Sequence, residues 1–340
     1  MKRVENILVT MGDPAGVSGE VVVKAFAALA KHKTPLVKAI RFLMEKRAAR
    51  LFVVGDRGVL EQARGITRSR LPVVPVLGLE ALADPFAQIA LLEGSRINMS
   101  QFRYGVPAYG AEQLAYLDRA IALAKRKDLS AIVTGPVNKE AVDKVLPGFL
   151  GHTGYLAEKL KAKAERMCFL TPDYLLALQT THVPLQKVSE GISKSGVAKS
   201  IAMLVEAGRR RFGKTLPVAV LGLNPHAGEH GLLGSEEERI IGPAMRHARK
   251  LGNPCDGPFP ADSFFIDRVR RYRLILAMYH DQGLVAVKPA YPRVSVNVTL
   301  GLPVVRTSVD HGSGYDIAGQ GKADETSLLS ALSAALELIP

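Results

Sequence analysis

The sequence predicts an α/β protein with a mainly parallel β-sheet, and three observations support this prediction. Short apolar runs recur along the 340 residues, segments with helical periodicity separate them, and polar turns follow their carboxyl ends. Strands that alternate with helices usually pair in parallel, because the helix carries the chain back across the sheet. Since 47% of the residues are hydrophobic, we expect a sizeable core, in two domains or in one large α/β domain.

The chain opens with a strand–turn–helix unit. Residues 7–10 form an apolar strand, Met11–Gly16 (MGDPAG) a glycine-rich turn, and residues 17–30 a helix with one apolar face. Such a turn usually faces a ligand, although the G-x-G-x-x-G spacing of the Rossmann fold is absent. Further strands are expected at 51–56, 72–77, 130–135, 175–178, 218–222, 274–278 and 303–308, and helices at 110–127, 155–163, 193–212, 235–251 and 326–338.

The net charge of +13 is concentrated in a few basic segments. Residues 31–50 hold seven Lys or Arg and one Glu and look like an insertion, and residues 209–211 and 268–273 add more cations. Neither Trp nor a DNA-binding motif accompanies these segments. We therefore expect solvated helix faces and a field that attracts anionic phosphate ligands, rather than a nucleic-acid partner.

Composition also indicates the compartment. No apolar run is long enough to span a bilayer, and the amino terminus lacks the apolar core and cleavage site of a signal peptide. Cys168 and Cys255 lie far apart, in no metal-like spacing. We expect a cytoplasmic protein with reduced thiols and no membrane partner.

The segment Ala277–Lys288 (AMYHDQGLVAVK) follows an apolar strand with a polar interruption. His280, Asp281 and Gln282 stand at the carboxyl end of that strand, where α/β enzymes place their chemistry. An imidazole can bind a metal, and a carboxylate can move a proton or orient a ligand. The plain alternative is a polar turn that happens to contain His.

Three histidines share this context. His182, His226 and His280 each follow an apolar strand, in a turn that holds Pro or Gly. Because the carboxyl ends of parallel strands lie at one edge of a sheet, three imidazoles distant in sequence can converge there. Three neutral imidazoles with an open position suit a catalytic Zn²⁺ or a related ion such as Co²⁺; three independent turn histidines are the alternative. The other polar-context histidines are expected at the surface: His32, His230 and His247.

A helix start near residue 151 offers a place for an anion. His152 and Thr153 of the sequence GHT precede the expected helix, where free backbone N–H groups attract negative charge. Simple capping of the helix by Thr153 explains the same pattern. Both interpretations stay open at this point.

Two further groups of residues favour a phosphorylated or nucleotide ligand. Residues 310–319 (DHGSGYDIAG) are small enough for close approach to a ligand, and Asp316 can accept hydrogen bonds from a ribose diol while repelling a 2′-phosphate. Lys288, Asn297 and Arg306 lie in and around a strand-like segment and suit a phosphate or carboxylate.

Nine short motifs occur in order along the chain. They are MGDPAG at 11–16, TGPVNK at 134–139, GHT at 151–153, THVPL at 181–185, NPHAGE at 224–229, PADSFF at 260–265, AMYHDQG at 277–283, VNVTLGLP at 296–303 and RTSVDHG at 306–312. Any one is weak, but together and in this order they are specific. The chain thereby resembles the 4-hydroxythreonine-4-phosphate dehydrogenase family of pyridoxine (vitamin B6) biosynthesis over nearly its whole length.

The resemblance implies a two-domain architecture. Residues 310–324 are similar to the cofactor loop of isocitrate and isopropylmalate dehydrogenases. The implied fold is their α/β/α arrangement with mainly parallel sheets, NAD bound outside the Rossmann scheme and an active site in the interdomain cleft. We expect a discontinuous NAD-binding domain of residues 1–137 and 286–340, and a metal, substrate and dimerisation domain of residues 138–285.

The resemblance also assigns roles to individual residues. It implies metal ligands at His182, His226 and His280, and substrate contacts at His152, Thr153, Lys288, Asn297 and Arg306. We expect cofactor contacts at Gly12, Asp13, His311, Gly312, Ser313, Asp316 and Ile317. The family pattern assigns no role to Asp281, and we expect a proton relay at Asp281 or Asp262 because each is a carboxylate. The implied cofactors are NAD and a divalent metal ion (Zn²⁺, or Mg²⁺ or Co²⁺). Asp316 goes with a preference for NAD in the related dehydrogenases.

The implied reaction is NAD-dependent oxidation of 4-phosphooxy-L-threonine to a β-keto acid that loses CO₂, in a homodimer with the site at the subunit interface. A paralogue that oxidises D-threonate or D-erythronate 4-phosphate offers the same groups to the same residues and is the near alternative. Phosphate acyltransferases, which share a related fold, are the alternative from another class. Three sites depart from the family pattern. Gly154 stands where Glu is usual, and residues 17–20 read Val-Ser-Gly-Glu where Ile/Val-Gly-Pro-Glu is usual. Residues 313–315 read Ser-Gly-Tyr where Thr-Ala-Leu or Thr-Ala-Phe is usual.

Overall fold

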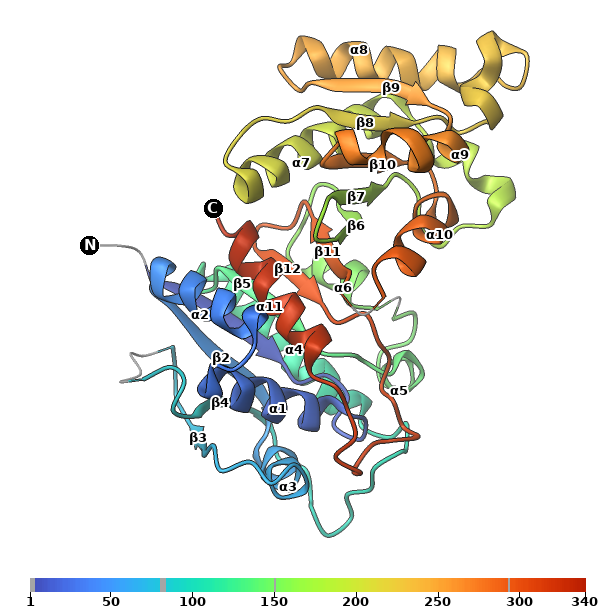
Figure 1. The fold of residues 1–340 in the computed structure, drawn as a ribbon. Coiled ribbons are helices and arrows are strands. Elements are labelled where there is room, and N and C mark those ends of the chain that lie inside the picture. The colour runs from blue at the N-terminus through green and yellow to red at the C-terminus, as the bar shows by residue number, and fades with distance from the viewer. Residues whose placement is uncertain (1–3, 80–83, 150, 293) are drawn as a thin grey trace. The chain divides into compact units, whose positions relative to one another are not determined.

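The computed structural model describes residues 4–79, 84–149, 151–292 and 294–340, and the chain divides into two compact units. Unit 1 comprises Met1–Lys163 and Leu302–Ile339, and unit 2 comprises Ala164–Gly301 with the terminal Pro340. Each unit is a sheet flanked by helices, so the predicted α/β class with mainly parallel strands is confirmed (Figure 1).

The boundaries between the units differ from the expected ones. They fall at 163/164 and 301/302, later than the expected 137/138 and 285/286. Residues 138–163 stay with unit 1 because α5 (Lys139–Asp143) packs on α4 (Gly110–Lys125), and because Tyr155 of α6 (His152–Lys159) donates a hydrogen bond to Asp118 of α4 at 2.6 Å. Residues 286–301 belong to unit 2 because β11 (Val296–Leu300) pairs with β6 (Arg166–Leu170).

Unit 1 contains an all-parallel run of strands. Their order is β3 (Val73–Pro75), β4 (Ile89–Ser95), β2 (Ala49–Asp56), β1 (Glu5–Thr10), β5 (Ala131–Thr134) and β12 (Val305–Ser308). Strand β4 was not expected. Ile7 lies opposite Leu51 and Ala131, so β1 is a central strand, and its apolar residues are fully buried. Sequence-distant segments therefore end side by side at one sheet edge.

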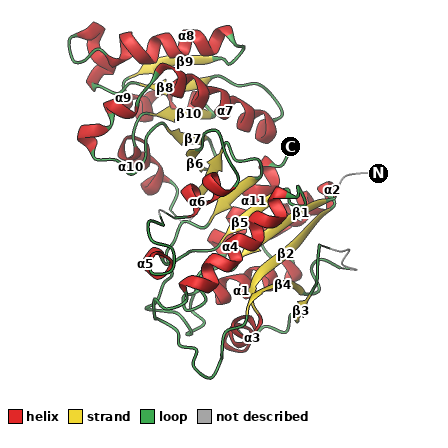
Figure 2. Ribbon diagram, turned by 180° about the vertical axis from the view of Figure 1, so that it is seen from behind, coloured by secondary structure: helices red, strands yellow, loops and turns green. Residues whose placement is uncertain are grey.

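Helices cover both faces of the unit 1 sheet (Figures 1 and 2). One layer contains α1 (Ser18–Lys31), α2 (Pro35–Arg47), α3 (Arg57–Ile66) and α11 (Thr326–Leu338), and α4 packs on β4, β1 and β2. Helix α11 is almost entirely buried, which explains the continuous apolar pattern of the last expected helix. The two layers give unit 1 a core on each side of its sheet.

The basic segment of residues 31–50 is mostly the amphipathic helix α2. Thr34 caps its start by accepting a hydrogen bond from the Val37 amide, and Val37, Ile40 and Met44 are buried. The guanidinium carbon of Arg41 lies 3.7 Å from the centroid of the Phe86 ring, so this cation makes a cation–π contact rather than facing solvent alone. The expectation of a solvated helix face thus holds for the other basic residues of this helix.

Unit 2 is a mixed sheet. Its order is β11, β6, β7 (Leu175–Leu178), β10 (Leu274–Ala277), β8 (Val218–Leu221) and β9 (Cys255–Phe259). Strands β11, β6 and β7 pair antiparallel, whereas β7, β10, β8 and β9 pair in parallel. The carboxyl ends of β7, β10 and β8 therefore lie next to one another, which is where the three predicted metal ligands follow.

The helices of unit 2 pack on both faces of the sheet, because successive side chains of β10 point to opposite faces. Gly208 of α7 (Lys194–Phe212) packs against the Leu274 side chain, and α8 (Gly242–Lys250) packs on α7. Ile275 and Ala277 point to the other face, where they join Phe264 and a helix that begins at His280. That helix, α10 (His280–Ala290), corrects the interpretation of Ala277–Lys288 as a strand broken by a turn.

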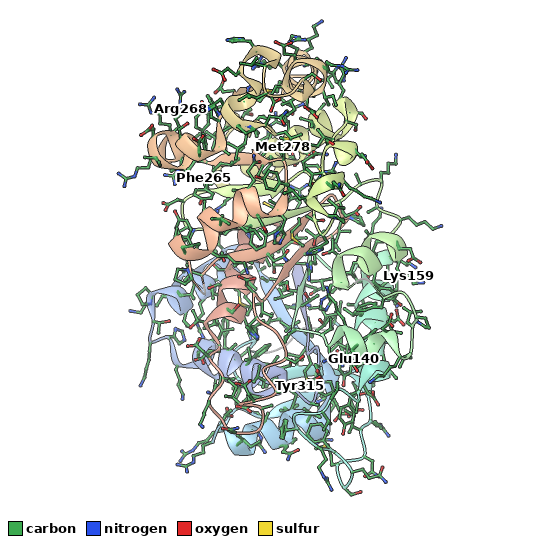
Figure 3. The ribbon with its side chains drawn as sticks, turned by 90° about the vertical axis from the view of Figure 1, so that its right-hand side faces the viewer. Glu140, Lys159, Phe265, Arg268, Met278 and Tyr315 are labelled. Carbon is green, nitrogen blue, oxygen red and sulfur yellow. The ribbon has the colours of Figure 1, made fainter. Side chains whose placement is uncertain are left out.

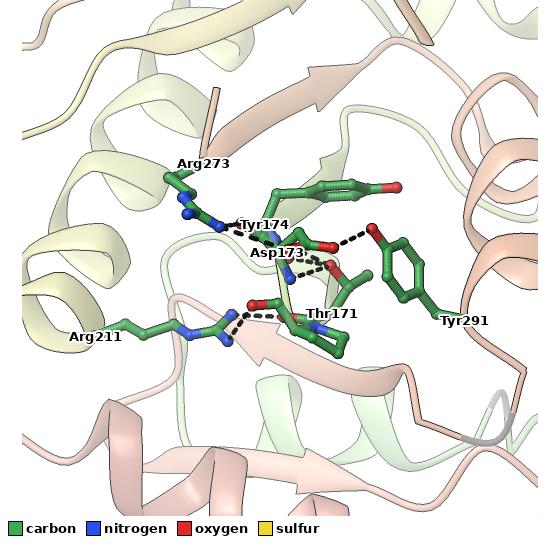
Figure 4. Close-up of polar contacts among 7 residues, drawn as sticks. Thr171, Asp173, Tyr174, Arg211, Arg273 and Tyr291 are labelled. Carbon is green, nitrogen blue, oxygen red and sulfur yellow. Dashed lines mark hydrogen bonds and ion pairs between the residues drawn. The ribbon is translucent and has the colours of Figure 1, made fainter. Parts of the chain in front are cut away.

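The turn between β6 and β7 is fixed by a polar cluster (Figure 4). Arg211 donates to the carbonyl of Thr171 at 2.9 Å, and Arg273 donates to the carbonyl of Asp173 at 2.7 Å. The Tyr291 hydroxyl donates to the Asp173 carboxylate at 2.6 Å. Because Tyr291 follows α10, this contact anchors the far end of the helix that His280 begins.

Within the described ranges, none of the helices has the length and hydropathy required to cross a membrane.

Candidate functional site

Arg306 is the buried cation of unit 1. It lies on β12 opposite Ile132 of β5, is 2% exposed, and donates from Nη2 to Thr134 Oγ1 at 2.7 Å. Burial lowers the pKa of Arg306 to about 10, because a desolvated guanidinium is less favourable than a hydrated one. At neutral pH the group remains charged, so the sheet edge holds a fixed positive charge in a poorly solvated position.

Helix α6 begins beside this cation. His152 is its first residue, and Thr153 Oγ1 accepts a hydrogen bond from Arg306 Nη1 at 3.5 Å. The N-cap position is Gly151, with φ of 106°, and no side chain caps the helix. Capping by Thr153, one of the two interpretations of the sequence, is therefore not what the structure contains.

The imidazole of His152 is held in its neutral form. Burial, together with the charges of Arg306 and Lys139, lowers the pKa of His152 well below its ordinary value. Its Nε2 atom is buried and has no hydrogen-bond partner within the described part of the chain. A buried polar atom without a protein partner is uncommon, so His152 Nε2 is available to a ligand.

Two loops that are far apart in the sequence pack together in unit 1. The Val17 amide donates to the Ser313 carbonyl at 2.8 Å, and a Cβ at Gly16 would lie 2.4 Å from that same oxygen. Gly12 has φ of 82°, and a Cβ there would lie 2.2 Å from the Pro136 carbonyl oxygen. Glycine is thus required at both positions by close backbone approach.

Asp13 is the polar centre of this loop pair. It is fully buried, accepts from the Ala15 amide at 3.0 Å, and accepts from the Tyr315 hydroxyl at 2.5 Å. Burial raises the pKa of Asp13, and the hydrogen bonds from Tyr315, Ser313 and Ala15 oppose that increase. Tyr315, labelled in Figure 3, is one of the residues that depart from the family pattern. The sequence placed Asp13 and Ser313 in one site, and the structure brings them together.

The other predicted cofactor residues occupy the same loop in different environments. Asp316 is exposed, and its carboxylate has no hydrogen bond to any described residue. His311 Nδ1 lies 2.9 Å from the Gly312 carbonyl, and its Nε2 is buried without a partner among the described residues. Gly312 borders open space, whereas Ile317 is half-buried and donates its amide to Gly314 at 3.2 Å. A free carboxylate and an orphaned imidazole nitrogen fit a polar ligand such as a nucleotide.

The predicted metal ligands follow three neighbouring strands of unit 2. The rings of His182 and His280 have centroids 5.6 Å apart. His226 is exposed, and both His182 and His226 have left-handed backbones, with φ of 46° and 53°. The structure thus brings two of the three imidazoles together. Among the described residues no set of three His, Cys, Asp or Glu side chains has converged into a metal-binding arrangement.

The loops that hold these histidines are tied to one another. Met278 donates its amide to Gln282 Oε1 at 2.6 Å, and Gln282 Nε2 donates to the Gly222 carbonyl at 2.7 Å, which joins the ends of β10 and β8. Thr180 Oγ1 donates to the Met278 carbonyl at 2.8 Å, which joins β7 to β10. Sequence analysis did not identify this role of Gln282, although its amide side chain in the HDQG motif was the available signal.

A carboxylate anchors the loop of His226. Glu237 Oε1 accepts from the amides of Leu223 and Asn224 at 2.7 and 2.8 Å. The Asn224 side chain donates to Glu236 at 2.8 Å, and this hydrogen bond is the main reason that the pKa of Glu236 is lowered. These contacts fix the backbone at the start of the loop and leave the imidazole itself exposed.

The candidate proton-relay residues differ in their surroundings. Asp281 Oδ1 lies 2.7 Å from His280 Nδ1, whereas Asp262 is exposed in the short helix α9 (Ala261–Ser263). A carboxylate on one imidazole nitrogen orients the ring and leaves the other nitrogen for a ligand. A cavity of about 330 Å³ lies beside His182, His280 and Asp281 and has room for a small molecule. By donor type the imidazoles suit a divalent ion, but within the described residues their placement does not yet form a set of three ligands.

The last two predicted substrate residues also belong to unit 2. Lys288 is exposed near the end of α10, and Asn297 lies on β11 opposite Phe169. The Oδ1 atom of Asn297 is buried without a partner in the described ranges. Arg306 belongs to unit 1, so the three members of this predicted set are divided between the units.

Comparison with known proteins identifies the family of these motifs. The model of the family described as pyridoxal phosphate biosynthetic protein PdxA matches residues 47–335. A 4-hydroxythreonine-4-phosphate dehydrogenase of Desulfosudis oleivorans is 36% identical over 334 residues, which cover 97% of this chain and 94% of the relative.

Two further relatives extend the comparison. A putative D-threonate 4-phosphate dehydrogenase of Oceanobacillus iheyensis is 38% identical, with 100% of this chain and 99% of the relative covered. The crystal structure of a 4-hydroxythreonine-4-phosphate dehydrogenase from Klebsiella pneumoniae superposes with a TM-score of 0.85 at 31% identity, covering 98% of each chain. The likeness therefore extends over essentially the whole molecule.

Proposed function

Because the chain belongs to the family of the pyridoxal phosphate biosynthetic protein PdxA, we propose that it is a 4-hydroxythreonine-4-phosphate dehydrogenase that uses NAD. It oxidises 4-phosphooxy-L-threonine to 2-amino-3-oxo-4-phosphooxybutanoate, which loses CO₂ to give 3-amino-2-oxopropyl phosphate for pyridoxal 5′-phosphate synthesis. The observation that carries the proposal is the buried anion-binding cluster of unit 1: Arg306 with lowered pKa, Thr153, and neutral His152 with an orphaned Nε2.

This cluster suits a phosphorylated substrate for a physical reason. Burying Arg306 costs free energy that structural packing alone does not require, since a hydrophobic residue of similar volume is usually at least as stable. An anionic ligand compensates a buried cation, and the first turn of α6 adds backbone N–H groups. We assign Lys288 and Asn297 to the same substrate, with the Asn297 amide oxygen available as an acceptor.

The cofactors are assigned by fit. His182, His226 and His280 would hold a divalent ion (Zn²⁺, Mg²⁺ or Co²⁺), and Gly12, Asp13, His311, Gly312, Ser313, Asp316 and Ile317 would hold NAD. A bound divalent ion lowers the pKa of a hydroxyl group and stabilises negative charge on its oxygen, and NAD accepts the hydride. The exposed carboxylate of Asp316 supports a ribose diol over a 2′-phosphate, and hence NAD over NADP.

The chain's own side chains then orient the substrate and move the proton. Arg306 and His152 hold the anionic end, Asp281 orients the His280 ring, and Asp262 or Asp281 receives the proton of the C3 hydroxyl group. Hydride departs from C3 as that proton leaves, and the β-keto acid that results loses CO₂ readily. The pH dependence of kcat for Asp262→Asn and Asp281→Asn separates the two candidates.

We further propose a cytoplasmic homodimer that completes its site at the subunit interface. Unit 2 exposes large apolar side chains, namely Leu185 at 73%, Leu232 at 77%, Ile266 at 79% and Val285 at 71%. Exposed apolar side chains of this size favour a protein partner. Light scattering of Leu185→Asp and Ile266→Asp variants tests whether they carry the dimer.

The near alternative is oxidation of D-threonate or D-erythronate 4-phosphate, and a relative named for D-threonate 4-phosphate is 38% identical to this chain. Steady-state NADH formation from each of the three substrates decides between them. We expect the highest kcat/KM for 4-phosphooxy-L-threonine and loss of the rate after treatment with EDTA. Rapid turnover of threonate phosphate with no NADH from phosphooxy-threonine overturns the proposal. No NADH from any of the three substrates, together with acyl transfer that survives both EDTA and His226→Ala, favours the acyltransferase class instead.

A further inference from the structure

We propose that Lys139 is a substrate-binding residue that supplies a second positive charge to the anion cluster of His152, Thr153 and Arg306 and contacts the phosphate group of the substrate. Neither the sequence motifs nor the resemblance assigned it this role. The inference rests on the proposed function for the identity of the substrate, and on the geometry of unit 1 for the role of the residue.

The backbone of unit 1 brings Lys139 to the start of α6. Lys139 is the first residue of α5, and the side chain of Asn138 caps that helix by accepting from the Ala141 amide at 2.7 Å. A Cβ at Gly151 would lie 3.2 Å from Lys139 Cε and 3.7 Å from Nζ. The lysine side chain therefore lies against Gly151, the residue that directly precedes His152.

The ammonium group of Lys139 is available for a ligand. The residue is exposed, and its Nζ forms no hydrogen bond or ion pair with any residue in the described ranges. Lys144, the residue directly after the same helix, differs in this respect because its Nζ pairs with Glu140 at 2.8 Å. Glu140 thus pairs with Lys144 and not with Lys139. Because Lys139 also lies beside the start of α6, its ammonium group is suited to bind an incoming anion.

The charges of the cluster match a phosphate monoester. Arg306 contributes one buried positive charge and is already hydrogen-bonded to Thr134 and Thr153. His152 is kept neutral, so it contributes a hydrogen bond and no charge. A phosphate monoester carries a charge between about −1.5 and −2 at neutral pH. Within unit 1, Lys139 supplies the second positive charge, from the exposed side of the cluster, whereas Lys288 belongs to unit 2.

The loop of Lys139 also touches the presumed cofactor loops. Pro136, three residues earlier, accepts a hydrogen bond from the Asp13 amide at 2.8 Å. The side chain of Asn138 opposes the rise in the pKa of Tyr315 that burial causes, so the two side chains lie near each other. The segment 136–139 therefore links the loop pair around Asp13 to the start of α6, which fixes the anion contact relative to those loops.

The test compares Lys139→Met with the matched control Lys144→Met, which removes the same charge from an ion-paired position. For Lys139→Met we expect KM for 4-phosphooxy-L-threonine to rise about tenfold or more, with kcat changed less than threefold, since a charge-assisted hydrogen bond is lost from binding. The inhibition constant of inorganic phosphate is expected to rise by a similar factor. Lys144→Met should leave both constants unchanged, and Lys139→Arg should restore part of the loss.

Two readouts separate this inference from the proposed function. Binding of inorganic phosphate, measured by calorimetry, does not depend on turnover: weaker binding to Lys139→Met than to Lys144→Met supports the role of Lys139 even if phosphooxy-threonine is not oxidised. Equal phosphate affinity of the two variants, with native thermal unfolding, overturns it even if the enzyme is active. An equal increase in KM for a substrate without phosphate, 4-hydroxythreonine, overturns the assignment to the phosphate group.

Discussion

The two units present their functional residues in opposite ways. In unit 1 the anion cluster is built in: Arg306 is 2% exposed and hydrogen-bonded, and His152 is held neutral by its surroundings. In unit 2 the side chain of His280 is 38% exposed, and His182 and His226 are exposed. Folding of unit 1 has therefore already desolvated the groups that are proposed to bind the substrate, whereas folding of unit 2 has fixed only the backbone that carries the imidazoles.

The backbone of unit 2 carries the conformational cost instead. Residues 226–230 have five consecutive left-handed φ values, between 42° and 82°. Only Gly228 adopts such a value freely, and each other residue costs about 1–2 kcal/mol. The carboxylate of Glu237 and the amide of Gln282 hold the neighbouring strand ends in place. Backbone strain that the surrounding structure maintains is often found at functional sites. The metal-binding role proposed for His226 is consistent with the strain in this turn.

The largest expected effect is a loss of activity in a unit 2 variant that remains folded. His226→Ala removes one proposed metal ligand from an exposed loop, so we expect kcat/KM to fall about a thousandfold, corresponding to the several kcal/mol that a metal ion contributes. The thermal midpoint should change little because the imidazole is exposed. Steady-state rates and metal analysis of the purified protein provide the measurement.

The matched control for that variant is His230→Ala. His230 lies in the same left-handed turn and is equally exposed, so it tests whether the turn or the imidazole matters. Retention of metal and rate in His230→Ala, with loss of both in His226→Ala, fits the proposed site. Equal metal content in both variants would remove His226 from the ligand set.

A second variant tests how much the hydrogen bonds of Gln282 between the ends of β10 and β8 contribute to stability. Gln282→Leu leaves the Met278 amide and the Gly222 carbonyl without their partners, so we expect the free energy of unfolding to fall by about 3 kcal/mol. Urea unfolding gives this value. Gln101→Leu, an exposed control, should cost less than about 0.5 kcal/mol. If the two variants cost the same, Gln282 does not hold the loops together.

The same contrast explains what the sequence could and could not reveal. Strand–helix alternation predicted the fold class, because apolar periodicity depends on local burial. The three strand-end histidines could be placed at one sheet edge, and the structure brings the rings of His182 and His280 within 5.6 Å. Helix α10 was not predicted, since His280-Asp281-Gln282-Gly283 has the composition of a turn and the helix is fixed by packing of Leu284 and Val287.

Contacts across long sequence separations were the principal omission. The partner of Asp13 is Tyr315, 302 residues later, and no local pattern connects the two residues. Lys139 was visible in the TGPVNK motif, but only the fold places its side chain against Gly151. The position of a domain boundary has the same cause: strand β11 belongs to unit 2 because of its pairing with β6, which hydropathy does not encode.

A third variant tests how much the hydrogen bond between Tyr315 and Asp13 contributes to the stability of unit 1 without a ligand. Tyr315→Phe removes the hydrogen bond to buried Asp13, so we expect a loss of about 2 kcal/mol in the free energy of unfolding at pH 7. The pKa of Asp13 is raised by burial, and Tyr315 opposes that rise, so the variant raises it further. A raised folded-state pKa destabilises the fold as pH increases from the unfolded value of 3.8 through the folded value. The loss should therefore be smaller at pH 4 than at pH 7.

The control for this variant is Tyr109→Phe, which removes a neutral hydrogen bond from the Arg103 amide at 3.2 Å. We expect its cost to be about 1 kcal/mol or less and independent of pH. Denaturant unfolding of both variants at pH 4 and pH 7 gives the comparison. A cost for Tyr315→Phe that does not vary with pH would show that Asp13 is not the partner that matters.

The smallest expected effect is a pH dependence that belongs to unit 1 alone. The pKa of His152 is lowered well below 6.5 in the folded protein, so below pH 6.5 the unfolded chain binds a proton that the folded imidazole does not. The free energy of unfolding should therefore fall by about 1.4 kcal/mol for each unit of pH below 6.5, until the folded-state pKa is reached. Urea unfolding at pH 7.5 and 5.5 measures this change, and His152→Asn should remove that part of the slope. A slope that the variant leaves intact would mean that His152 takes up its proton in the folded state. The anion cluster would then have an additional positive charge.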